Sequence, residues 1–83
     1  MTKLDKKIDT LIKQSTYYNK KIKTIEKENN IKIDLLEIIE NDKSEDNNEL
    51  IIEFQLDIEM NNKLITKYST ILIDIDYELR KYR

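Results

Sequence analysis

The sequence predicts an all-α fold, an antiparallel two-helix coiled-coil hairpin, on three observations. Apolar residues recur at alternating spacings of three and four along both parts of the 83-residue chain, which is the repeat of a coiled coil. Residues 41–48 form a wholly polar stretch between the two repeats, which suits a loop. Glycine and proline are absent, so a fold with several tight turns is not favoured.

The first helix is expected over residues 3–41. Nine of its twelve seam positions are apolar. These positions are Met1, Leu4, Ile8, Leu11, Ser15, Tyr18, Ile22, Ile25, Asn29, Lys32, Leu36 and Ile39. The positions opposite the seam are all polar: Lys6, Lys13, Lys20, Lys27, Asp34 and Asn41. An apolar seam with a polar back is typical of an amphipathic helix.

The second helix is expected over residues 49–82, after a loop at 42–48. Nine of its ten seam positions are apolar. They are Ile51, Phe54, Ile58, Asn61, Ile65, Tyr68, Leu72, Ile75, Leu79 and Tyr82. A chain of this length forms one thin core, so residues 1–83 are interpreted as a single domain.

The hairpin register follows from the position of the loop. A turn centred near residue 45 pairs residues whose numbers sum to 90, which places Asn29 opposite Asn61. Two buried amides can satisfy each other, whereas an amide facing isoleucine costs ~1–3 kcal/mol. Asn29 and Asn61 are therefore predicted as register-setting core residues. Lys32 falls opposite Ile58, and we expect its ammonium group to reach outward to Asp57 or Glu59.

An α+β fold is the alternative, in which a β-hairpin with strands near 31–39 and 50–59 lies between two helices. Residues 50–60 and 71–79 largely alternate between apolar and polar, which is a strand signal. Ile51 and Leu72 break this alternation, and both are seam positions of the helical repeat. These two residues favour the helical hairpin.

The helical interpretation leaves many apolar side chains outside the seam. A two-helix hairpin has too little core to cover them, and exposed apolar surface of this extent marks an interface. We therefore expect self-association, with two hairpins forming a four-helix bundle. The predicted function is a non-catalytic protein–protein interaction or assembly module. Its predicted partners are further copies of the chain, a larger protein with a basic surface, or both.

Charge is segregated along the chain. Residues 1–32 carry a net charge of +5, residues 33–62 carry −9, and residues 63–83 carry +2. A second functional hypothesis is a small acidic inhibitor, of the kind that phages and viruses encode. Its acidic segment, residues 33–62, would dock on a basic nucleic-acid-binding surface of a larger protein. The predicted interaction residues are Glu45, Asp46, Glu49, Glu53, Asp57, Ile38, Ile52 and Leu56.

Composition argues against catalysis. The chain has no histidine, cysteine or glycine, so the usual general base, thiol nucleophile and phosphate-binding loop cannot be assembled. We therefore expect no enzyme activity, no cofactor and no metal site. A third functional hypothesis is calcium binding, because residues 42–53 resemble an EF-hand loop. Asp42, Ser44, Asp46, Asn48 and Glu53 occupy its ligand places, but Asn47 stands where glycine makes the sharp turn.

The lysine row opposite the first seam could follow a phosphate backbone. No arginine accompanies it in residues 1–41 and no base-reading element is recognisable, so we do not expect direct nucleic-acid binding. The longest apolar runs, 50–52 and 71–73, have three residues, against the roughly 20 that a membrane-spanning helix needs. We expect a cytoplasmic protein that does not enter a membrane.

Overall fold

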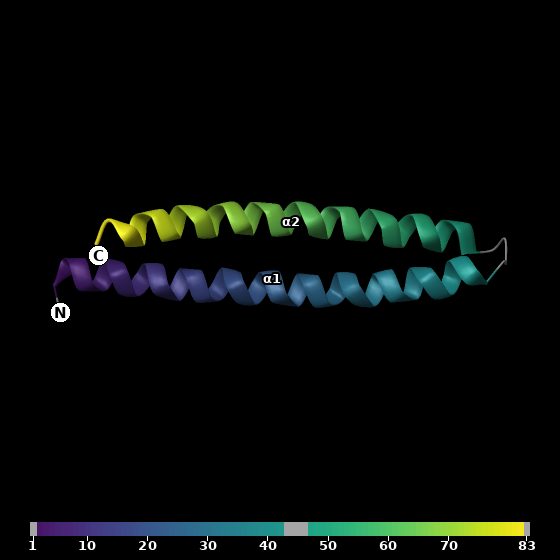
Figure 1. Ribbon diagram of the computed structural model, residues 1–83, viewed down its shortest axis with the longest axis horizontal. Helices are drawn as coiled ribbons and strands as arrows, with labels where there is room; N and C mark the ends of the chain where they lie inside the picture. The colour runs from purple at the N-terminus through teal and green to yellow at the C-terminus, as the bar shows by residue number, and fades with distance from the viewer. Residues whose placement is uncertain (1, 43–46, 83) are drawn as a thin grey trace.

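The protein is a hairpin of two long helices. The structure, a computed structural model, describes residues 2–42 and 47–82. Helix α1 comprises Lys3–Asn41 and helix α2 comprises Asn48–Arg80. The helices run antiparallel, so both termini lie at one end and the connection lies at the other (Figure 1). The molecule measures 63 × 15 × 15 Å, and the predicted all-α hairpin is confirmed.

Helix α1 begins and ends where the sequence predicts. The Thr2 hydroxyl accepts a hydrogen bond from the Asp5 backbone N–H at 3.2 Å, and the Asp5 carboxylate accepts one from the Thr2 backbone N–H at 3.3 Å. This capping box satisfies two backbone donors that the first helical turn leaves free. At the other end Asp42 is extended, and its N–H donates to the carbonyl groups of Ile38 and Ile39.

Helix α2 is slightly displaced from its predicted bounds of 49–82. It begins one residue earlier, at Asn48, and the Asn47 side chain makes no capping hydrogen bond. It ends at Arg80, and Lys81 and Tyr82 form a turn. Tyr82, a predicted seam position, lies in this turn and is half-buried, with Lys7 Nζ 5.5 Å from its ring centroid.

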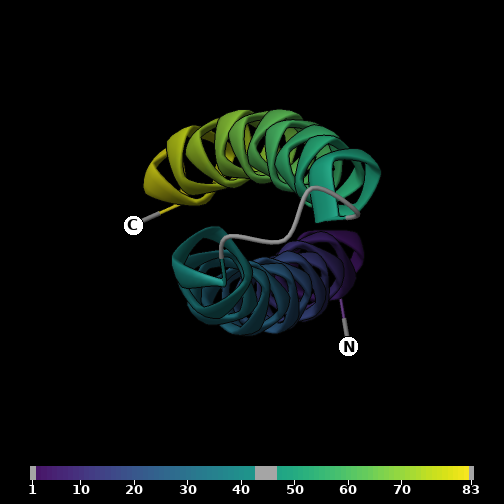
Figure 2. The ribbon, with the colours of Figure 1, turned by 90° about the vertical axis from the view of Figure 1, so that its right-hand side faces the viewer.

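The burial pattern follows the predicted seams. In α1 every seam position from residue 8 to residue 39 is half-buried or buried, and the residues between them are exposed. In α2 every seam position is at least half-buried, and residues 57, 69, 71 and 78 at its flanks are half-buried as well. Seen end-on, the two helices wind around each other in the left-handed sense (Figure 2), as a strict seven-residue repeat requires.

The alternative with strands at 31–39 and 50–59 is wrong. Both segments are helical over their whole length. The alternating residues of 50–60 do not share one face on a helix. Instead they place Ile58 on the seam and leave Ile52, Leu56 and Met60 exposed. Ile51, which breaks the strand pattern, is half-buried on the seam.

The core is thin. In the described part of the chain only Asn29 and Ile75 are buried, each with 6% of its surface exposed. Fourteen large apolar side chains are exposed, from 37% at Leu64 to 68% at Ile73. Most apolar seam residues of the described chain are therefore only half-buried, and a large set of apolar side chains outside the seam stays in solvent.

Candidate interaction surface

A layer of three asparagines crosses the middle of the hairpin. The Asn61 amide Nδ2 donates to Asn29 Oδ1 at 2.9 Å, and Asn29 Nδ2 donates to Asn62 Oδ1 at 3.1 Å. Asn29 is thus both acceptor and donor, and the described side chains include no buried polar atom without a partner. The predicted juxtaposition of Asn29 and Asn61 is present. The pairing with Asn62 was not predicted, because Asn62 lies beside the seam.

Lys32 occupies a seam position one turn nearer the loop than Asn29, where the repeat would place an apolar residue. Its ammonium group lies 3.1 Å from Asp57 Oδ2 on α2 and 3.1 Å from Glu28 Oε1 on α1. The lysine stem covers the seam while the charged end reaches solvent, and only 18% of the side chain is exposed. Of the two carboxylates expected as partners, Asp57 is the one that binds.

The carboxylates of Asp57 and Glu28 also shift the protonation equilibrium of the Lys32 ammonium group. The hydrogen bond to Asp57 raises the pKa of Lys32 above its ordinary value, and the bond to Glu28 adds to the effect. In the same direction, the Tyr82 hydroxyl raises the pKa of Lys7 and the Tyr17 hydroxyl raises the pKa of Lys21. In all three cases the neighbouring group favours the protonated form of the lysine.

The contacts of Lys32 identify one side of the hairpin. Glu28 and Asp57 both meet this lysine, so they lie on the same side. On α2, Leu50 and Leu64 stand seven residues from Asp57 and share that side, as does Met60, three residues on. On α1, Ile31, Leu35 and Ile38 continue from Glu28 at spacings of three and four.

A groove extends this side toward the termini. It is lined by Tyr17, Lys20, Lys21, Thr24, Ile25, Leu64 and Tyr68. The Lys21 ammonium group lies 5.2 Å from the Tyr17 ring centroid, and the Tyr18 and Tyr68 rings pack 5.5 Å apart across the seam. We call the exposed apolar residues of this side the lateral strip. Its members are Tyr17, Ile31, Leu35, Ile38, Leu50, Met60 and Leu64.

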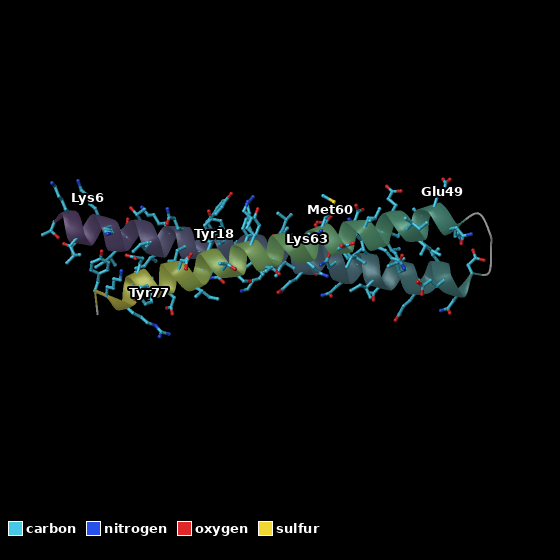
Figure 3. All side chains as sticks on the ribbon, turned by 90° about the horizontal axis from the view of Figure 1, so that it is seen from above. Lys6, Tyr18, Glu49, Met60, Lys63 and Tyr77 are labelled. Atoms are coloured by element: carbon cyan, nitrogen blue, oxygen red, sulfur yellow. The ribbon has the colours of Figure 1, made fainter. Side chains whose placement is uncertain are left out.

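The predicted interaction residues do not form one surface. Ile38 belongs to the lateral strip, whereas Leu56 lies two residues from each of two seam positions and so faces away from α1, with Ile52 one turn before it. Glu49 and Glu53 are exposed, and Asp57 is bound to Lys32. Glu45 and Asp46 lie outside the described residues. Figure 3 shows Glu49 and Met60 projecting from α2 away from α1.

The described part of the loop lacks the EF-hand's turn. Asn47, at the sixth place of the resemblance, has φ −88° and ψ −5°, which is right-handed helical geometry. Its Nδ2 lies 3.5 Å from Asp42 Oδ2. Two of the supposed ligands, Ser44 and Asp46, lie outside the described residues. Within residues 2–42 and 47–82, no group of three or more acidic side chains is placed to hold a metal ion.

Two further findings bear on function. Neither helix, over the residues described, combines the length and apolarity needed to cross a membrane. Comparison with protein-family models, with curated proteins and with solved structures finds no match to this chain. The molecule's own surface is therefore the basis for a functional proposal.

Sequence reasoning found the exposed apolar residues but not their grouping. The sequence pattern showed that many apolar residues lie outside the seam without assigning them to a side of the hairpin. The structure puts Leu35, Leu50 and Leu64 on the Lys32 side, and Ile33, two residues before Leu35, on the other side of α1. A signal was present in the sequence, because Leu50, Asp57 and Leu64 are spaced by seven residues.

Proposed function

We propose that this protein is a non-catalytic assembly module that binds further helices along its exposed apolar surface, and that copies of the chain bind one another. The observation that carries the proposal is the ratio of buried to exposed apolar residues. One large apolar side chain is buried in the described chain, and fourteen are exposed. Monomeric soluble proteins rarely expose contiguous apolar surface of this extent, whereas helices that pack into bundles do so before assembly.

The lateral strip supports the proposal because its residues lie together. Seven large apolar side chains from both helices follow one side of the hairpin, and Leu35, Leu50 and Leu64 are 37–40% exposed beside the seam. Further helices laid along this side would extend the existing core in the manner of a four-helix bundle. By contrast, the back of α1 is formed by Lys6, Lys13, Lys20, Lys27, Asp34 and Asn41, all exposed.

Sedimentation equilibrium of the full chain tests this proposal. At tens of micromolar we expect a mass at least twice the 10.1 kDa of one chain. The variant Ile31→Gln with Ile38→Gln should lower the measured mass. The control, Lys27→Gln with Asp34→Gln, places glutamines at the same seven-residue spacing on the polar back, leaves the net charge unchanged, and should leave the mass unaltered. A single 10.1 kDa species across this concentration range would contradict self-assembly.

Unpaired carboxylates near the loop favour a second candidate function. Asp34, Glu37, Glu40, Glu49 and Glu53 are exposed, and none of them forms an ion pair among the described side chains. These charges would steer the hairpin toward a basic surface, often one that binds nucleic acid. The chain would then act as a small inhibitor that occupies this surface.

Capture from the source cells, with DNA as a competitor, tests the inhibitor hypothesis. The immobilised chain should retain a nucleic-acid-binding protein, and added duplex DNA should displace it. Replacing Glu49 and Glu53 by lysine should abolish capture, whereas Lys6→Glu with Lys13→Glu should preserve it. The opposite dependence, on the lysines and not on the glutamates, would exclude an acidic docking site.

A further inference from the structure

The asparagine layer divides the hairpin into two parts of opposite charge. The loop-side part, residues 30–60, carries two lysines and ten carboxylates, a net charge of −8. The terminus-side part, residues 1–29 and 61–83, carries thirteen basic and seven acidic side chains, a net charge of +6. The molecule is therefore a long dipole whose sign changes at Asn29 and Asn61.

The lateral strip extends to both sides of this division. It reaches from Tyr17 on the basic side to Leu50 on the acidic side, and in the hairpin register Leu50 lies level with residue 40 of α1. The midpoint between residues 17 and 40 coincides with the layer of Asn29 and Asn61. The apolar strip is thus nearly centred on the point where the charge changes sign.

We propose that the lateral strip binds the same strip of a second copy, with the two hairpins antiparallel and a two-fold axis crossing them at the asparagine layer. This inference rests on the proposed self-assembly and specifies its partner, face and orientation. The two-fold axis turns each hairpin end for end, so the acidic part of one copy covers the basic part of the other. A parallel arrangement would place −8 beside −8 and +6 beside +6.

Charged residues at the border of the strip agree with this orientation. Glu53 is exposed beside Leu50 and Asp57 on the loop side, and Lys67 is exposed three residues after Leu64 on the terminus side. In the antiparallel dimer, α2 of the second copy runs in the opposite direction through the asparagine layer. Glu53 of one copy then lies within about one helical turn, along the axis, of Lys67 of the other. Opposite charges at the rim of an interface fix orientation and discourage the alternative alignment.

The area of the strip is sufficient for a specific dimer. From residue 17 to residue 40 it spans about 35 Å at 1.5 Å per residue. Multiplied by the 15 Å width of the hairpin, this gives a footprint of about 500 Å² per copy, or roughly 1,000 Å² in total. Specific interfaces begin at about that size.

Distances between spin labels distinguish the two orientations. The chain has no cysteine, so single substitutions at Lys13 and Lys27, exposed on the polar back of α1 and outside the lateral strip, accept one label each. In the antiparallel dimer the two copies of residue 27 are offset along the axis by about 6 Å, and those of residue 13 by about 48 Å. We therefore expect the distance measured by pulsed dipolar spectroscopy to be at least ~25 Å longer for Lys13→Cys than for Lys27→Cys.

Equal distances at residues 13 and 27, in a sample whose sedimentation mass is that of a dimer, would overturn the antiparallel orientation while leaving self-assembly intact. A monomer mass for the unlabelled wild-type chain would overturn self-assembly itself. The circular dichroism spectrum of each labelled variant should equal that of the wild type. If a variant then shows no distance between labels, it has failed to associate and has not unfolded.

Charge reversal provides an independent check on unlabelled protein. We expect the dimer dissociation constant to rise about tenfold between 50 and 500 mM NaCl. Glu53→Lys and Lys67→Glu should each weaken the dimer, and the two together should restore wild-type affinity, because the opposite charges are again paired. A dissociation constant that falls with salt, or a double variant as weak as the two single losses combined, would contradict the antiparallel arrangement.

Discussion

The two sides of the asparagine layer differ in how completely they bury their apolar residues. The terminus side contains Ile75, the one apolar residue that is buried in the described chain, and the tilted ring pair of Tyr18 and Tyr68. The shorter loop side contains eight of the fourteen exposed large apolar residues and, among its described residues, no buried one. Both sides have the same seam repeat. The comparison shows that a correct repeat specifies the hairpin, whereas the residues outside it determine which apolar side chains stay exposed.

Truncating a seam residue on each side should reveal this difference in packing most clearly. Ile75→Ala should lower the free energy of unfolding by about 2–4 kcal/mol, because it leaves a cavity in the most enclosed part of the seam. Ile39→Ala, at a half-buried position near the loop, should cost less. Urea unfolding of both variants at one protein concentration measures the difference. Equal losses would show that the two sides are packed alike.

The layer that separates the two sides should behave as a coupled unit. Asn29→Ile and Asn61→Ile should each destabilise the hairpin by ~1–3 kcal/mol, because each leaves the remaining core amide facing an apolar group. The double variant should recover most of that loss, and exposed Asn62 can then hydrogen-bond to water. Strictly additive losses in denaturant unfolding would show that the amide pairing contributes nothing to the register.

The start of α1 tests the outer end of the terminus side. Thr2→Ala removes the oxygen that accepts from the Asp5 N–H, and should cost about 1 kcal/mol. Amide exchange in the first turn should accelerate while exchange near Ile75 stays unchanged. Thr10→Ala is the matched control, because the Thr10 hydroxyl donates to the Lys6 carbonyl within the helix and caps nothing. A loss in the control as large as that in Thr2→Ala would argue against a capping role.

The smallest effect is expected from Lys32, on the loop side. Its pKa is raised in the folded chain by Asp57 and then Glu28, so its contribution is present below its ordinary pKa of 10.5 and is lost as the pH rises through the higher folded value. Wild type should therefore lose more stability between pH 10 and 12 than Lys32→Met, which has no ammonium group to titrate. Thermal unfolding of both chains across this range measures the difference. Parallel pH profiles would mean that the two ion pairs do not stabilise the fold.

Much of this fold could be predicted from spacing alone. The bounds of α1, the seams of both helices and the meeting of Asn29 with Asn61 all follow from one repeat and one loop. The position of Asn62 could not be derived in that way. It lies beside the seam, and its bond to Asn29 depends on the side-chain rotamers that the packed helices select.

The candidate interaction surface was less predictable. Ile38, Ile52 and Leu56 are near one another in level along the hairpin, and all three were predicted as interaction residues of the acidic segment, residues 33–62. Helical rotation separates them, since Leu56 faces away from α1 and Ile38 lies on the Lys32 side. The contact of Lys32 with Asp57, and the groove shared by Tyr17, Lys21 and Leu64, show which flank of α1 adjoins which flank of α2.

The central claim is that a second copy completes the packing that the loop side lacks. Hydrogen exchange of the wild-type chain at two protein concentrations, below and above its dimer dissociation constant, tests this most directly. Backbone amides at 31–38 and 50–60 should exchange more slowly at the higher concentration, and by a larger factor than those around Ile75. Exchange that is independent of concentration on both sides of the asparagine layer would contradict the claim.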